Sequence, residues 1–274
     1  MSDKISAPAK INLNLKVVGV RSDGYLLLSS AVAFADLCDE IEVKDAAEFS
    51  VKLSGEFAKH IDNPKDTTLH RAHAAMKKLS PGLPNFEISL RKNIPVGGGL
   101  GGGSSDAAAF IRYIAEKYRP AARENDLYAA ALCVGADVPV CLCGRAAVFS
   151  GIGEKIKPAA SKYAGKSAIL VNPGARLLTK DVLGLFKKEM RGGAAPARNS
   201  GAAAGNDFLD CAARLEPQIK EILTLIDAAE GCVLCGMSGS GPTCFAIFDG
   251  EGARDAAASK FNPRYWIKKC AIKP

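Results

Sequence analysis

The residues best suited to chemistry form one glycine-rich segment, which reads Pro95-Val-Gly-Gly-Gly-Leu-Gly-Gly-Gly-Ser-Ser-Asp106. Six glycines in seven positions let a backbone approach a ligand closely and turn its amides inward. A helix that starts at Ser104 or Ser105 would aim free N–H groups and its positive dipole end at the same place. The segment therefore predicts a site for a di- or triphosphate, and the alternative is a glycine turn with one serine as a helix cap. The predicted phosphate-binding residues are Pro95, Val96, Gly97, Gly98, Gly99, Leu100, Gly101, Gly102, Gly103, Ser104 and Ser105.

Two better-known phosphate motifs fit this segment poorly. A P-loop that started at Gly97 would need a lysine where Gly103 stands, so the group that reaches the β- and γ-phosphates is missing. Gly97, Gly99 and Gly102 also satisfy the dinucleotide pattern G-x-G-x-x-G, but the strand before them alternates and ends in polar residues, unlike a buried parallel strand. A dinucleotide oxidoreductase is kept as a minor alternative.

A second glycine cluster runs from Gly236 to Thr243 and leads directly into an apolar segment. Two glycine and serine loops, far apart in sequence, could close on one nucleotide from two domains. The alternative is an ordinary turn, which this cluster alone would favour.

Nine cysteines, an odd number, stand in a chain too long to need disulfides in order to fold. Cys232 and Cys235 form the one CxxC pair, with no second pair at zinc-site spacing, which argues against a metal centre. A redox pair is a minor alternative.

The composition is that of a globular protein, with 48% hydrophobic and 24% charged residues in 274. The net charge of +7 fits either a cationic cleft for a phosphorylated ligand or a solvated basic surface. No long basic run indicates nucleic-acid binding, and no apolar stretch indicates a signal peptide or a membrane span. We expect a soluble, cytoplasmic protein.

The first half alternates between predicted strands and helices. Ile11, Leu13, Leu15 and Val17 share one face of a strand that runs to Gly19, with Lys10 and Asn12 on the opposite, polar face. Further strands are expected at 26–43, 49–53, 86–90, 138–142 and 146–149, and helices at 67–79, 104–118 and 126–134.

The second half is expected to begin in a segment rich in glycine, proline, lysine and serine, 151–164. We place two domains at 1–155 and 156–274. Residues 192–205 have the composition of a mobile loop. Strands are expected at 167–171, 243–248 and the C-terminus, and helices at 208–229 and 251–260. The predicted strands and helices do not follow a regular βαβ order, which predicts an α+β fold with largely antiparallel sheets.

Three segments together resemble the motifs of the GHMP small-molecule kinases, in family order: Ala7 to Leu13, Pro95 to Ser105, and Ser238 to Thr243. Two further segments, Gly19 to Tyr25 and Gly135 to Pro139, are most similar to the branch that acts on 4-diphosphocytidyl-2-C-methyl-D-erythritol. The resemblance spans nearly the whole chain. It implies a two-domain kinase of non-mevalonate isoprenoid synthesis, with ATP and Mg²⁺, that phosphorylates the 2-hydroxyl of this substrate in the interdomain cleft.

The resemblance also implies roles for individual residues. Lys10 and Asp137 would form the catalytic pair at the acceptor hydroxyl; the alternatives are a solvated strand lysine and a capping aspartate. The implied acceptor-binding residues are Asn12, Tyr25, Leu26, Gly239, Ser240 and Gly241. The partner would be a small-molecule alcohol, and the chain a monomer or weak homodimer.

Three positions depart from the family pattern. Leu26 stands where the family has a histidine at the cytosine, Leu183 where it tends to have an aromatic residue, and Thr67 where it has an asparagine near adenine. These departures leave two alternatives open: a kinase of this family that acts on another small alcohol, and a non-catalytic nucleotide-binding relative.

Overall fold

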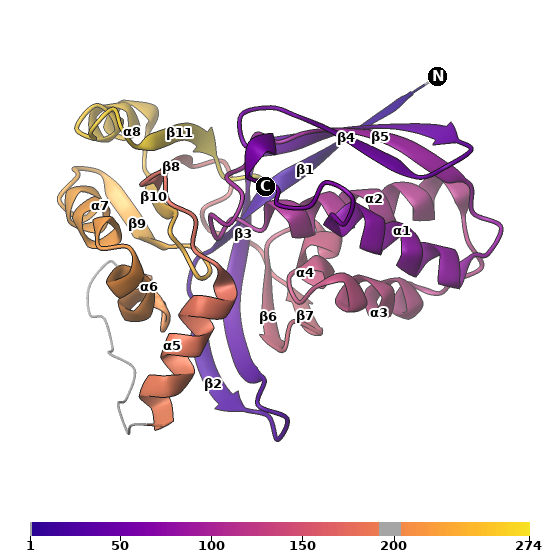
Figure 1. Ribbon diagram of the computed structural model, residues 1–274. Coiled ribbons are helices and arrows are strands. Elements are labelled where there is room, and N and C mark those ends of the chain that lie inside the picture. Colours follow the sequence, from indigo (N-terminus) through magenta and orange to yellow (C-terminus); the bar gives the residue numbers. More distant parts are fainter. Residues whose placement is uncertain (1, 192–203) are drawn as a thin grey trace.

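The computed structural model describes residues 2–191 and 204–274 (Figure 1). The strands of the first half are β1 (Asp3–Asn12), β2 (Lys16–Val20), β3 (Leu26–Ala46), β4 (Ser50–Ser54), β5 (Asn85–Arg91), β6 (Ala147–Gly151) and β7 (Lys155–Pro158). Its helices are α1 (Thr68–Leu79), α2 (Gly102–Tyr118), α3 (Glu124–Val134), α4 (Val138–Cys143) and the short 3-10 helix η1 (Ala58–His60). The second half contains strands β8 (Ser167–Asn172), β9 (Cys232–Met237), β10 (Cys244–Phe248) and β11 (Trp266–Ala271) and helices α5 (Thr179–Arg191), α6 (Leu209–Leu215), α7 (Gln218–Asp227) and α8 (Glu251–Ala258).

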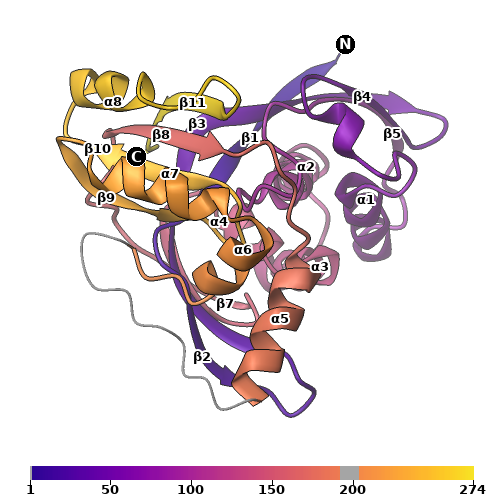
Figure 2. The same cartoon turned by 60° about the vertical axis from the view of Figure 1, so that its left-hand side comes forward.

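The long strand β3 organises the first sheet. It pairs with β1 and β2 along one edge and with β5 and β6 along the other, always antiparallel, and β4 and β7 extend the sheet beyond these neighbours. Helices α1 to α4 gather on one side of this sheet (Figures 1 and 2). They bury a core that includes Phe34, Met76, Phe86 and Phe110.

The second sheet is antiparallel, with the strand order β11-β8-β10-β9. Helices α6, α7 and α8 lie beside it (Figure 2). The two halves share apolar packing, because Leu15 and Leu26 of the first half belong to the core cluster of the second. A bridge between Ala35 and Ile272 also joins β3 to the chain end. The α+β class, the two-part architecture and the largely antiparallel sheets are confirmed.

Two predicted elements of the first half are wrong. The strand expected to run to Gly19 is broken at 13–15, where the side-chain oxygen of Asn14 accepts the N–H of Ala31 and replaces a backbone partner. Residues 138–142 form helix α4 and not a strand. A short apolar run does not distinguish the two states, and Pro139 fits the first turn of a helix, where its missing N–H costs nothing.

The second half departs from expectation in three places, one of which is that helix α5 was not predicted. The helix expected at 208–229 is divided into α6 and α7, since Pro217 lacks the N–H that would continue α6. Strand β9 was not predicted. Most of the segment expected to be mobile, 192–203, lies outside the described residues, whereas the amide of Ala204 donates to the carbonyl of Cys235.

The domain boundary at 155/156 falls at the start of β7, which pairs with β6, and it stays a prediction. In the described part of the chain, no helix has the length and apolarity needed to cross a bilayer.

Candidate active site

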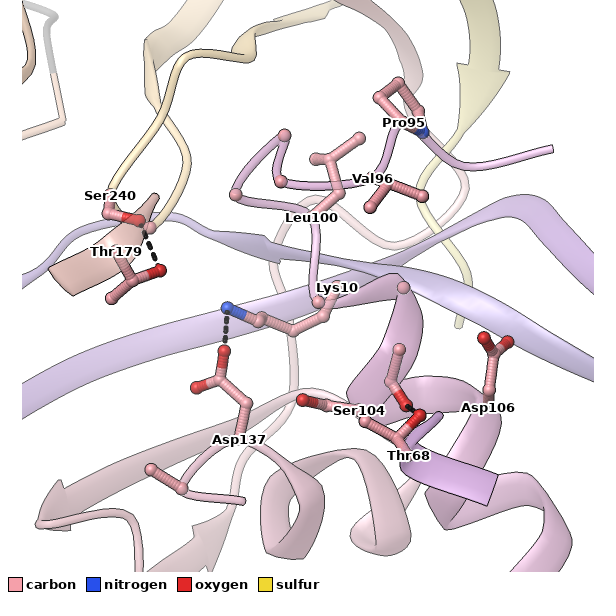
Figure 3. Close-up of a pocket in the computed structure, with 18 of the residues that line it drawn as sticks. Lys10, Thr68, Pro95, Val96, Leu100, Ser104, Asp106, Asp137, Thr179 and Ser240 are labelled. Carbon is pink, nitrogen blue, oxygen red and sulfur yellow. Dashed lines mark hydrogen bonds and ion pairs between the residues drawn. The ribbon is translucent and has the colours of Figure 1, made fainter. Parts of the chain in front are cut away.

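A cavity of about 710 Å³ lies between the two halves. Residues of all three kinase-like motifs, Ala7 to Leu13, Pro95 to Ser105 and Ser238 to Thr243, line it. This volume is typical of sites for small molecules and cofactors. Figure 3 shows Lys10 and Asp137 pointing toward each other beneath the glycine loop, with Thr179 and Ser240 to the left of the Lys10 ammonium. The residues of the three motifs, distant in sequence, therefore share one chamber, as predicted.

The glycine loop ends in an open helix terminus. Helix α2 begins at Gly102, two residues before the predicted start, and no side chain caps it. Ser104 and Ser105 therefore lie inside the first turn, and the alternative that one of them is an N-cap is wrong. The hydroxyl of Ser105 donates to the carbonyl of Pro8, whereas Ser104 lines the cavity. The uncapped terminus leaves N–H groups available to an anion.

Lys10 reaches the cavity because β1 is irregular at this point. The pairing of β1 with β3 shifts register between Pro8 and Lys10, and the freed amide of Lys10 donates to the carbonyl of Leu100 at 2.9 Å. Its ammonium lies 3.0 Å from a carboxylate oxygen of Asp137 and donates to Asn12 Oδ1 at 2.5 Å. Lys10 is only 2% exposed, so the alternative of a solvated strand lysine is wrong.

Asp137 stands at the N-cap position of α4, but its side chain makes no capping hydrogen bond. The carboxylate instead pairs with Lys10, and its side chain is 37% exposed. A carboxylate that is held by an ammonium and still open to the cavity can accept a proton from a bound hydroxyl. Helix capping was the predicted alternative role of Asp137, but its side chain makes no capping hydrogen bond to α4.

The third motif closes the chamber through direct contacts with the other two. The hydroxyl of Ser238 accepts the N–H of Asn12 at 3.0 Å and donates to the carbonyl of Gly99 at 2.9 Å. The amide of Thr243 donates to the carbonyl of Gly98. The predicted meeting of two glycine loops from the two halves is thus present as hydrogen bonds.

A buried charge cluster, which sequence reasoning missed, supports the start of α2. The ammonium of Lys92 pairs with Asp39 and lies 2.7 Å from Asp106 Oδ2, and all three side chains are almost fully buried. Asp39 also accepts the backbone N–H groups of Asn93 and Ile94. Burial raises the pKa of Asp106 to about 7, partly opposed by Lys92, and its second oxygen, Oδ1, has no hydrogen-bond partner among the described residues.

This raised pKa predicts a pH-dependent stability. Between the ordinary carboxyl pKa of 3.8 and about 7, the unfolded chain releases a proton that folded Asp106 retains, so rising pH favours unfolding. The contribution is at most roughly 1.4 kcal/mol per pH unit. In urea titrations from about pH 4 to pH 7, Asp106→Asn should gain free energy of unfolding relative to the natural protein as the pH rises. Parallel pH curves for the two proteins would contradict the prediction.

The structure separates the predicted acceptor-binding residues into two groups. Asn12, Gly239 and Ser240 line the cavity, as do Thr67 and Leu183. Tyr25, Leu26 and Gly241 do not: Tyr25 is 59% exposed beneath the guanidinium of Arg21, and Leu26 is buried in the core of the second half. The roles of these residues stay predictions. Sequence reasoning missed Thr179, whose hydroxyl lies 3.0 Å from that of Ser240, because no motif contains it.

Comparison with known proteins agrees with the fold and identifies the family. The family described as "GHMP kinases N terminal domain" matches residues 66–145, and "GHMP kinases C terminal" matches 182–268. The chain belongs to the GHMP kinase family. Within this family, a relative from Methylorubrum extorquens is 40% identical across 96% of both chains, and one from Rhodopseudomonas palustris is 37% identical across 95% of this chain and 94% of its own. Both are named 4-diphosphocytidyl-2-C-methyl-D-erythritol kinase. A crystal structure of 4-(cytidine 5'-diphospho)-2C-methyl-D-erythritol kinase superposes with a TM-score of 0.76, at 29% identity over the whole of both chains.

Proposed function

We propose that the protein is an ATP-dependent kinase that phosphorylates the 2-hydroxyl of 4-diphosphocytidyl-2-C-methyl-D-erythritol in the non-mevalonate isoprenoid pathway. The observation that carries the proposal is the Lys10–Asp137 pair, 3.0 Å apart, beside an uncapped helix terminus in the cavity. Full-length relatives that bear this enzyme's name support the choice of substrate.

The proposed reaction is a direct transfer in which the acceptor oxygen attacks the γ-phosphorus of ATP. The new oxygen–phosphorus bond forms as the bond to the ADP oxygen breaks, and the carboxylate of Asp137 takes the hydroxyl proton. The ammonium of Lys10 holds Asp137 in place and counters the charge that develops on the transferred group. The free N–H groups at the start of α2 bind the phosphates.

Mg²⁺ is the metal that the family implies, and Ser104 fits it better than Ser105. Magnesium takes few protein ligands and prefers oxygen together with substrate phosphates. Ser104 lines the cavity beside Asp137 (Figure 3), whereas the hydroxyl of Ser105 is bound to Pro8. When bound, the ion would neutralise phosphate charge.

A kinase for another small alcohol is the second candidate. Leu28 and Leu183 both face the cavity, and neither offers a hydrogen bond or an aromatic ring to a base. The hydroxyls of Thr179 and Ser240, which also line the cavity, could hold the polar groups of many alcohols. This lining favours a small alcohol that carries no base.

Turnover with a panel of alcohols separates these candidates. The purified protein is given ATP and Mg²⁺ with 4-diphosphocytidyl-2-C-methyl-D-erythritol, homoserine, mevalonate or galactose, and ADP release is recorded. We expect release only with the cytidyl substrate, with phosphate on its 2-hydroxyl in the product's NMR spectrum. ADP release only with another alcohol would show that the protein is a kinase with a different substrate. ATP binding without ADP release in any mixture would favour the non-catalytic alternative.

A further inference from the structure

One ion pair crosses the cavity from one half of the molecule to the other. Arg176 Nη1 and Nη2 donate to the two carboxylate oxygens of Asp62, each at 2.7 Å, and both residues line the cavity. Asp62 follows η1 in the first half, and Arg176 lies between β8 and α5 in the second. Among the ion pairs formed by residues 2–191 and 204–274, this is the one that joins the two halves.

The side chain of Arg176 also lies directly on the glycine loop. A Cβ placed on Gly97 would meet Arg176 Cγ at 2.5 Å, so the arginine stem runs across this residue. The segment that carries Arg176 is fixed at both ends: the side chain of Asn172 bonds Thr243 and the amide of Gly174, and Thr179 meets Ser240. Arg176 is thus extended from an anchored support across the loop that would hold the phosphates.

We propose that the Asp62–Arg176 pair is a strap that closes the nucleotide side of the cavity and must open before a nucleotide can leave. The inference rests on the proposed ATP site. Asp62 is 75% exposed and Arg176 34%, and an ion pair so open to water is weak enough to break and re-form readily. Its two parallel hydrogen bonds define one closed geometry. The strap retains bound nucleotide without preventing exchange.

The experiment measures the dissociation rate of a fluorescent ATP analogue, with no acceptor present, after mixing with excess ATP. Asp62→Asn and Arg176→Gln should each speed dissociation by about two- to fivefold, the range expected for loss of an exposed ion pair. Arg176→Asp places two carboxylates face to face and should speed it further. The exchanged pair, Asp62→Arg with Arg176→Asp, should return the rate toward that of the natural protein.

Glu87→Gln is the matched control. Lys52 and Glu87 also form an exposed ion pair at 2.7 Å, but they join neighbouring strands outside the cavity, so this variant should leave the rate unchanged. Salt offers a second readout. Screening should speed dissociation from both proteins, because it weakens the phosphate contacts that they share, but it should speed it more in the natural protein than in Asp62→Asn.

Three results would overturn the strap. Unchanged dissociation in Asp62→Asn and Arg176→Gln would show that the pair does not hinder exit. Slower dissociation in Asp62→Asn would mean that Asp62 competes with the nucleotide for Arg176. If neither the natural protein nor Glu87→Gln binds the analogue, the proposed ATP site fails, and the strap fails with it.

Discussion

Asp137→Asn should lower kcat by about 10²–10⁴-fold, the usual contribution of a general base, while ATP affinity changes little. Asparagine has the same shape and can still accept a hydrogen bond from Lys10, which lies 3.0 Å from the carboxylate. It cannot take a proton from the acceptor hydroxyl. Because the proposed phosphate site is formed by the glycine loop and α2, on other elements, ATP binding should persist when the chemical step is lost.

The measurement is steady-state turnover together with direct titration of ATP. Asp126→Asn serves as the control, since Asp126 is a half-exposed aspartate in the first turn of the neighbouring helix α3 and does not line the cavity, and asparagine there can still accept the N–H of Arg123. Full turnover in Asp137→Asn would show that the carboxylate of Asp137 is not the general base. An equal loss in both variants would point to a general effect of lost negative charge.

Gly99→Val should abolish measurable ATP binding and lower the free energy of unfolding by roughly 2–5 kcal/mol. Gly99 has a φ of +78°, which costs other residues about 1–2 kcal/mol, and overpacking adds roughly 1–3 kcal/mol. A Cβ at Gly99 would lie 2.2 Å from the carbonyl oxygen of Ser238 and 3.0 Å from backbone atoms of Gly241. The added side chain therefore separates the two glycine loops rather than only obstructing the ligand.

Gly165→Val is the control that measures only the free-energy cost of placing valine at a positive φ. Gly165 has nearly the same φ, +76°, but a Cβ there would meet nothing within 4 Å. This variant should lose only the conformational part of the stability and keep its affinity for ATP. Calorimetric titration and urea unfolding of both variants test the difference. Unchanged ATP affinity in Gly99→Val would show that the loop is only a turn.

Local patterns were sufficient for much of the fold. Alternation predicted β4 and β5, and the helical period predicted α1 and most of α3. They failed where local signals agree with two structures, as in the short apolar run that became α4. The division of the helix expected at 208–229 was foreseeable, because Pro217 stands within it.

The candidate site was predictable wherever one continuous motif carried it. The glycine loop, Lys10, Asp137 and the third motif could all be named from sequence, and the structure places them around one cavity. The burial of Lys10 could not, since its alternating strand pattern indicates a solvated face, and what covers that face comes from later in the chain. Asp62 and Arg176, 114 positions apart, belong to no motif, and only the tertiary structure pairs them.

The sharing of apolar packing between the halves has a consequence for synthesis on the ribosome. Leu15 and Leu26 emerge early, yet other members of their core cluster, such as Ile169, Ile222 and Phe248, are translated much later. The amide of Lys273, which follows β11, donates to the carbonyl of Phe34 in β3. A nascent chain therefore carries uncovered apolar surface until the strands and helices of the second half have been translated, and we expect chaperones that recognise exposed apolar segments to bind it.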